Sequence, residues 1–135
     1  METASILTLC LAEAFGVYLI AVGAGALLAP DRWRAIGAEL ERSPGLTLVT
    51  GVFTFAFGAA LVGLHHSLAD PLAIVITIAA AIGAIEGVLL LVVPEPMIAL
   101  GRPFFSRPRA WAAIVVVLGL VFLALGLTGH AGPNL

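Results

Sequence analysis

Charged residues are scarce in this chain, and their scarcity excludes several classes of protein. Only 10% of the 135 residues are charged, while 61% are hydrophobic; a soluble domain has about 25% charged residues. Too few polar side chains remain to cover a water-facing surface, so a soluble globular fold is excluded. Disorder is excluded as well, because disordered chains are poor in apolar residues. Six basic residues and a net charge of -2 provide no basic face for nucleic acid.

Cysteine is nearly absent, and the sequence contains no catalytic motif. The single cysteine excludes an internal disulfide and a multi-cysteine metal site. The glycines are spaced for contact between helices, and none of them forms a phosphate-binding loop. Neither a nucleophile motif nor a metalloprotease pair is found. We therefore expect a protein that is not an enzyme and that has no cofactor.

Long apolar runs are what the chain does contain. A helix needs about 20 mostly apolar residues to cross a bilayer, and segments 5–29, 45–64, 72–93 and 110–128 qualify. All eight prolines fall between or beyond these segments, as expected for helices, because an interior proline removes a backbone hydrogen bond. The first segment lacks the basic start of a cleaved signal peptide. The sequence predicts an all-α polytopic membrane protein with four transmembrane helices in a single domain, residues 1–135.

The arginines predict the orientation of the chain in the membrane. All six lie in the first and third connections between spans: Arg32, Arg34, Arg42, Arg102, Arg107 and Arg109. Because basic residues accumulate in cytoplasmic loops, we expect both connections in the cytoplasm and both termini outside. Trp33 and Trp111 fall at the same boundary, where aromatic residues are enriched.

The second half of the sequence repeats features of the first half. Glycines and prolines match 64 residues later, or 68 residues later if four residues are inserted near the end: Gly23 with Gly87, Pro30 with Pro94, Gly37 with Gly101, Pro44 with Pro108, Gly51 with Gly119, and Gly58 with Gly126. We interpret the chain as two tandem parallel helical-hairpin repeats, residues 5–66 and 72–130.

Short interfacial helices are expected in the cytoplasmic connections. Trp33, Ile36 and Leu40 share one helical face in residues 31–42, and such a helix can lie in the headgroup layer with its apolar face inward. The equivalent stretch in the second half is similar, but Gly101 and Pro103 interrupt it.

Small residues recur at helical spacing in the spans. Without a hydrophobic force between helices in lipid, small residues allow the close packing that holds a bundle together. The residues expected to pack helices are Ala79, Gly83, Gly87, Gly51, Gly58, Gly119 and Gly126. A spare face of this kind would serve self-association or a membrane-protein partner.

Glu86 is the polar residue most suited to chemistry. It lies roughly 10 Å inside the third span at 1.5 Å per residue, where an ionised side chain costs at least ~2.5 kcal/mol. Tyr18, Thr50 and Thr54 lie at a similar depth and could hydrogen-bond it. Two interpretations stay open: a carboxylate that handles protons or cations, or a protonated acid that joins two helices through a hydrogen bond.

A second set of polar residues is expected at the outer side of the membrane: Cys10, Glu13, His65, His66, Asp70 and His130. Imidazole, thiolate and carboxylate groups suit zinc or copper, and a pair of outer histidines could bracket a haem. The spacing matches no recognised motif, so we interpret these residues as interfacial polar groups. A metal or haem site at Cys10, His65, His66 and His130 is the alternative.

The first span resembles a known kind of protein. Its glycine-containing stretch and the Leu-x-Pro-acid-basic sequence after it occur at residues 16–23 and 27–33. They are similar to small bacterial inner-membrane proteins with four helices. The resemblance implies the bacterial inner membrane as the location, and it implies no activity.

These observations favour a small accessory or assembly subunit, or a homo-oligomeric structural protein, in contact with lipid. The first alternative is a small proton- or solute-conducting oligomer that uses Glu86. The second alternative is the metal or haem site at the outer face.

Overall fold

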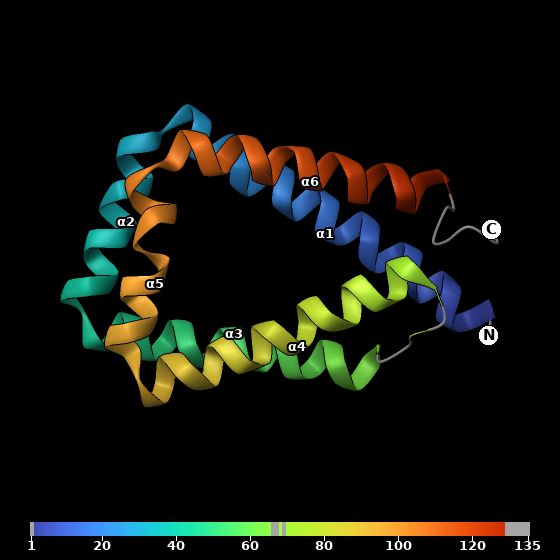
Figure 1. The fold of residues 1–135 in the computed structure, drawn as a ribbon, viewed down its shortest axis with the longest axis horizontal. Coiled ribbons are helices and arrows are strands. Elements are labelled where there is room, and N and C mark those ends of the chain that lie inside the picture. The colour runs from blue at the N-terminus through green and yellow to red at the C-terminus, as the bar shows by residue number, and fades with distance from the viewer. Residues whose placement is uncertain (1, 66–67, 69, 129–135) are drawn as a thin grey trace.

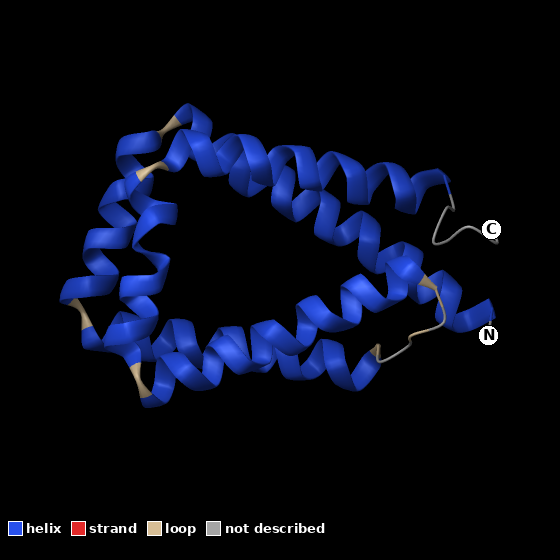
Figure 2. Cartoon of the chain, in the orientation of Figure 1, coloured by secondary structure: helices blue, strands red, loops and turns tan. Residues whose placement is uncertain are grey.

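The computed structural model describes residues 2–65, 68 and 70–128, and these residues form six α-helices. The helices are α1 (Glu2–Leu28), α2 (Pro30–Arg42), α3 (Pro44–Leu64), α4 (Pro71–Val92), α5 (Pro94–Ser106) and α6 (Pro108–Thr128). Figure 2 shows short connections from α1 to α2, from α2 to α3, from α4 to α5 and from α5 to α6. Helices α1, α3, α4 and α6 are long and apolar enough to span a membrane, and they correspond to the four predicted spans.

Proline occupies the first position of every helix after α1, at Pro30, Pro44, Pro71, Pro94 and Pro108. The first turn of a helix does not need the missing N–H group, and the fixed φ of proline suits it. Side-chain caps support two of these starts. The backbone N–H of Leu46 donates to Ser43 Oγ at 3.1 Å, and that of Ala73 donates to Asp70 Oδ1 at 2.8 Å.

The four spans form two antiparallel pairs. Helix α1 packs along α6 and α3 packs along α4, and the pairs diverge from one end of the molecule to the other (Figure 1). We call the end with the start of α1 and the end of α6 the terminal end. Helices α2 and α5 lie side by side across the other end, which we call the capped end.

This pairing differs from the predicted helical hairpins, in which each pair would form within one half of the chain. Helix α2 connects α1 to α3, and α5 connects α4 to α6. Each connecting helix has 13 residues and therefore extends about 20 Å. That length is about twice the 8–10 Å between the axes of packed helices. The ends joined by α2 or α5 are held apart, so each span packs against a span from the other half.

The helix boundaries of the two halves share one offset. Pro94 and Pro108 begin α5 and α6 64 residues after Pro30 and Pro44 begin α2 and α3. Gly51 lies seven residues after Pro44 and Gly119 lies eleven residues after Pro108. The four-residue shift between these glycines therefore falls within the first turns of α6. The internal repeat itself stays a prediction.

Glycines bring the paired helices close together. A Cβ atom would lie 2.3 Å from the backbone nitrogen of Ala84 at Gly58, 2.3 Å from that of Phe55 at Gly87, and 2.8 Å from the Gly16 carbonyl oxygen at Gly119. Larger side chains therefore require the facing backbone to move.

The other residues expected to pack helices differ in burial, and one of them lies outside the helix interfaces. Gly51 and Gly126 are buried, Gly83 is half-buried and Ala79 is exposed. Ala80 is buried where Ala79 was expected. Steps of four residues drift around a helix that has 3.6 residues per turn, so Ala79 lies off the face that Gly87 occupies.

Most of the apolar surface of the spans remains uncovered. Only 17% to 22% of the most apolar stretch of each span is buried inside the molecule. Such large uncovered apolar faces require a hydrocarbon solvent, so the chain is a multi-pass membrane protein with four spans.

Candidate functional site

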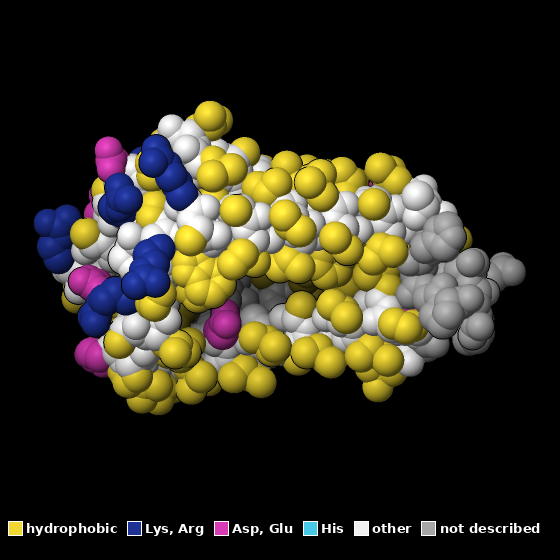
Figure 3. Space-filling model, turned by 45° about the horizontal axis from the view of Figure 1, so that its top comes forward, with side chains coloured by type: hydrophobic (Ala, Val, Ile, Leu, Met, Phe, Trp, Pro, Cys, Tyr) yellow, Lys and Arg dark blue, Asp and Glu magenta, His cyan; other side chains and the backbone are white. Residues whose placement is uncertain are grey.

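A cavity of about 800 Å³ lies at the capped end, between the α3–α4 pair and the capping helices α2 and α5. Its walls come from α2, α3, α4 and α5. Figure 3 shows a hollow edged by apolar side chains, with an acidic side chain at its margin. The volume falls within the range of about 300–1,000 Å³ for small-molecule sites. The cavity is therefore the candidate functional site.

Three of the four polar residues that the sequence placed inside the membrane line this cavity. They are Thr50, Thr54 and Glu86. The Thr50 hydroxyl donates to the Leu46 carbonyl oxygen at 2.8 Å, so its own oxygen remains available as an acceptor. The fourth residue, Tyr18, is 64% exposed on α1 and does not line the cavity. No hydrogen bond joins Tyr18 to Glu86 among the described residues, so the suggested contact between them gains no support.

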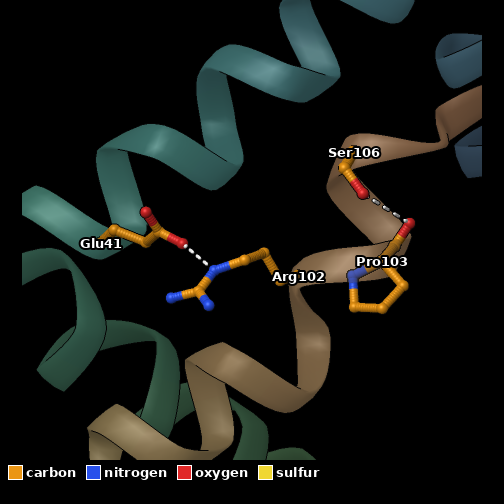
Figure 4. A network of polar contacts seen from close by, with 4 residues as sticks. All are labelled: Glu41, Arg102, Pro103 and Ser106. Carbon is orange, nitrogen blue, oxygen red and sulfur yellow. Dashed lines mark hydrogen bonds and ion pairs between the residues drawn. The ribbon is translucent and has the colours of Figure 1, made fainter.

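The charged groups around the cavity differ in how they are paired. Arg102 Nε lies 2.7 Å from Glu41 Oε1, as Figure 4 shows, and Arg34 Nη1 lies 2.8 Å from Asp31 Oδ1. In the part of the chain that the structure describes, the Glu86 carboxylate has no ion pair and no side-chain hydrogen bond. The two lining arginines thus have carboxylate partners, whereas the lining carboxylate of α4 has no cation.

Aromatic side chains hold the two capping helices together over the cavity. Trp33 Nε1 donates to the Phe104 carbonyl oxygen at 3.1 Å. The Trp33 and Phe105 rings stack at 5.4 Å between α2 and α5, and the Phe104 and Trp111 rings stack at 4.1 Å between α5 and α6. Gly37 permits the approach, since a Cβ atom there would lie 2.5 Å from that of Phe105.

Helix α5 continues through Gly101 and Pro103, where the sequence predicted an interruption. Pro103 lies in the last turn, and its carbonyl oxygen accepts from the Arg107 backbone N–H at 3.1 Å. It also accepts from the Ser106 hydroxyl at 3.5 Å (Figure 4). Because the segment was expected to be broken, sequence reasoning missed the lining residue Arg102.

His65 connects three helices at the terminal end. It is 2% exposed. Its Nε2 atom lies 2.7 Å from Thr8 Oγ1 on α1, and its Nδ1 atom lies 3.0 Å from Thr77 Oγ1 on α4. A small apolar core of Ala12, Leu72 and Ile76 lies at the same end. Both ring nitrogens are engaged by hydroxyl groups, so His65 closes the terminal end and is not available to a metal.

The remaining residues of the expected outer cluster are not brought together. Cys10 is exposed, Glu13 packs on α6 at Gly126, and Asp70 caps α4. His66 and His130 lie outside the described residues. Residues 2–65, 68 and 70–128 contain no group of three potential metal ligands, and the metal or haem alternative gains no support from them.

Comparison with protein-family models, curated proteins and solved structures finds no match for this chain. Its fold defines a helical membrane protein with four spans, two helix pairs and two capping helices. The expected resemblance to small bacterial inner-membrane proteins stays an expectation. Function is therefore inferred from the cavity.

Proposed function

We propose that this protein is a non-catalytic membrane protein that binds a proton or a small solute in the cavity and conducts it across the membrane as an oligomer. The observation that carries the proposal is the lining of the cavity by Glu86, Thr50 and Thr54. An ionisable residue within a span is costly, and such residues often mark an ion or substrate path.

The closed terminal end supports the same function. A conducting protein with a controlled path needs a site that is separated from one side of the membrane. Here the hydrogen bonds of His65 to Thr8 and Thr77 close the narrow end, while the cavity occupies the wide end. Opening the terminal end would connect Glu86 to the other side.

A flux assay in liposomes tests this function. The purified protein is reconstituted, and proton flux is followed with an enclosed pH-sensitive dye. We expect flux with the wild type and its loss in Glu86→Gln. The matched control is Glu13→Gln, which removes the other carboxylate from the spans without changing the cavity. Absence of wild-type flux, or equal flux in Glu86→Gln, contradicts the proposal.

The second candidate function is an accessory or assembly subunit, or a homo-oligomeric structural protein. A Cβ atom at Gly25 or Gly63 would meet no atom within 4 Å, so another helix can approach the backbone there. Sizing in mild detergent is expected to give a particle larger than one chain, and Gly25→Leu is expected to reduce it. A strictly monomeric particle without a co-purifying protein contradicts this candidate.

We also propose the bacterial inner membrane as the location, with both termini outside and α2 and α5 in the cytoplasm. The support is the arginine content of α2, α5 and the start of α6. In a Cys10→Ser background, Leu68→Cys is expected to react with an impermeant maleimide in intact cells. Glu39→Cys is expected to react only after permeabilisation. The reverse pattern overturns the orientation.

A further inference from the structure

The cavity combines one unpaired carboxylate with largely apolar walls, and this combination identifies a class of ligand. We propose that it binds a small organic cation with an apolar body, and that the positive group of this ligand lies at Glu86. The inference rests on the proposed function and specifies its substrate.

The pairing of charges selects a cation. Arg34 and Arg102 already have Asp31 and Glu41 at 2.8 Å and 2.7 Å. An anion would have to compete with those carboxylates for the two arginines and would also meet the Glu86 carboxylate. A cation meets an unpaired carboxylate and displaces no existing ion pair.

The depth of Glu86 strengthens this selection. Glu86 lies six residues before the end of α4 at Val92, roughly 9 Å along the helix axis. A charge at that depth is costly in a bilayer. Glu86 is exposed at the cavity, so a ligand can reach its carboxylate, and the attraction between opposite charges lets a bound cation offset this cost.

The apolar walls require more than a bare ion. Leu90, Met97, Ile98, Leu100, Phe104 and Phe105 line the cavity. A hydrated metal ion would leave these side chains without apolar contacts, whereas an organic cation covers them. Aromatic faces attract organic cations, and methionine adapts its shape to different ligands. A volume of about 800 Å³ accommodates one drug-sized molecule.

Two probes of the same shape and opposite charge test the inference. Tetraphenylphosphonium is the cation and tetraphenylborate is the anion. Each is equilibrated by dialysis with full-length protein in nanodiscs of zwitterionic lipid, and the uptake of empty nanodiscs is subtracted. We expect saturable binding of the phosphonium alone. Glu86→Gln is expected to weaken it about tenfold or more, Glu86→Asp is expected to retain part of it, and Glu13→Gln is expected to leave it unchanged.

A measurement on the wild type does not depend on how the variants fold. Dicyclohexylcarbodiimide modifies carboxyl groups in membranes, and mass spectrometry of peptides locates the product. The phosphonium is expected to protect Glu86 and not Glu13. Lack of protection, phosphonium uptake no greater than that of empty nanodiscs, or saturable binding of the borate overturns the inference.

The outcomes separate the two proposals. Proton flux that depends on Glu86, without phosphonium binding, leaves the proposed function standing and rejects the organic cation. Phosphonium binding at Glu86, without flux of protons or of the phosphonium, supports the cation site and rejects conduction.

Discussion

The two ends of the molecule are built from the same four spans and differ in how closely these approach. At the terminal end, α1 and α4 meet at the core of Ala12, Leu72 and Ile76, and His65 connects them through threonine hydroxyls. At the capped end, the helix pairs are separated, and the cavity lies between the α3–α4 pair and the capping helices α2 and α5. All four spans are predominantly apolar, so hydropathy alone does not explain the difference.

The connections between the spans explain it. At the terminal end the connection from α3 to α4 lies within one pair, and no connecting helix among the described residues holds the two pairs apart. At the capped end two 13-residue helices join the spans, and each has the length needed to keep two span ends apart. The lipid bilayer thus determines that the spans are apolar helices. The lengths of the connections determine at which end the spans leave room for a ligand.

The largest effect is expected from a substitution that forces apart the α3–α4 pair, because this pair contributes to both ends of the molecule. In Gly58→Val the new side chain collides with the α4 backbone at Ala84, where even a Cβ atom would lie 2.3 Å away. We expect a loss of about 1–3 kcal/mol in the free energy of unfolding, as for overpacking in protein cores. Reversible denaturation in micelles measures it. The control is Gly63→Val on the same helix, where the added carbon meets open space. Equal losses would argue against close packing of α3 on α4.

A moderate effect is expected from a change confined to the terminal end. His65→Leu removes the hydrogen bonds to Thr8 and Thr77. Side-chain hydrogen bonds in membrane helices contribute about 0.6 kcal/mol each, so we expect a loss of about 1 kcal/mol in unfolding free energy. In the flux assay the same variant is expected to raise the rate, because the closed end is loosened. Unchanged stability together with unchanged flux would show that His65 does not close this end.

The smallest effect is expected at the capped end, from the ion pair of Arg102 with Glu41. The two side chains are 62% and 42% exposed, and exposed ion pairs contribute about 0.2–1 kcal/mol. A double-mutant cycle with Arg102→Ala and Glu41→Ala is expected to give a coupling energy within that range, and high salt is expected to reduce it. A coupling above this range would mean that the pair is less accessible to solvent than the structure shows.

The four spans were predictable from sequence because the length and apolar content of a span follow directly from bilayer thickness. The helix starts marked by proline were also predictable, because the fixed φ of proline suits the first turn of a helix. The choice of partner for each span was not, because glycine spacing gives a helix a packing face without naming the helix that contacts it. Residues 94–106 show a second limit: Gly101 and Pro103 predicted a break, whereas α5 is continuous and its Phe105 packs on Trp33 and Gly37, which are distant in sequence.

The candidate site was predictable only in part. The useful information was again the position of each residue within its own helix. Depth along a helix identified Glu86, Thr50 and Thr54. The same depth argument failed for Tyr18, because depth does not specify the direction in which a side chain points. Arg102 and Glu41 carried no signal of their own, since their place at the cavity follows from how α2 and α5 cross.

The crossed pairing of the spans has a consequence for a divided chain. Each pair takes one helix from residues 2–65 and one from residues 70–128, so neither fragment contains a long interface of its own. A cut between α3 and α4 would turn both interfaces into contacts between two separate molecules, and each fragment would need the other in order to assemble.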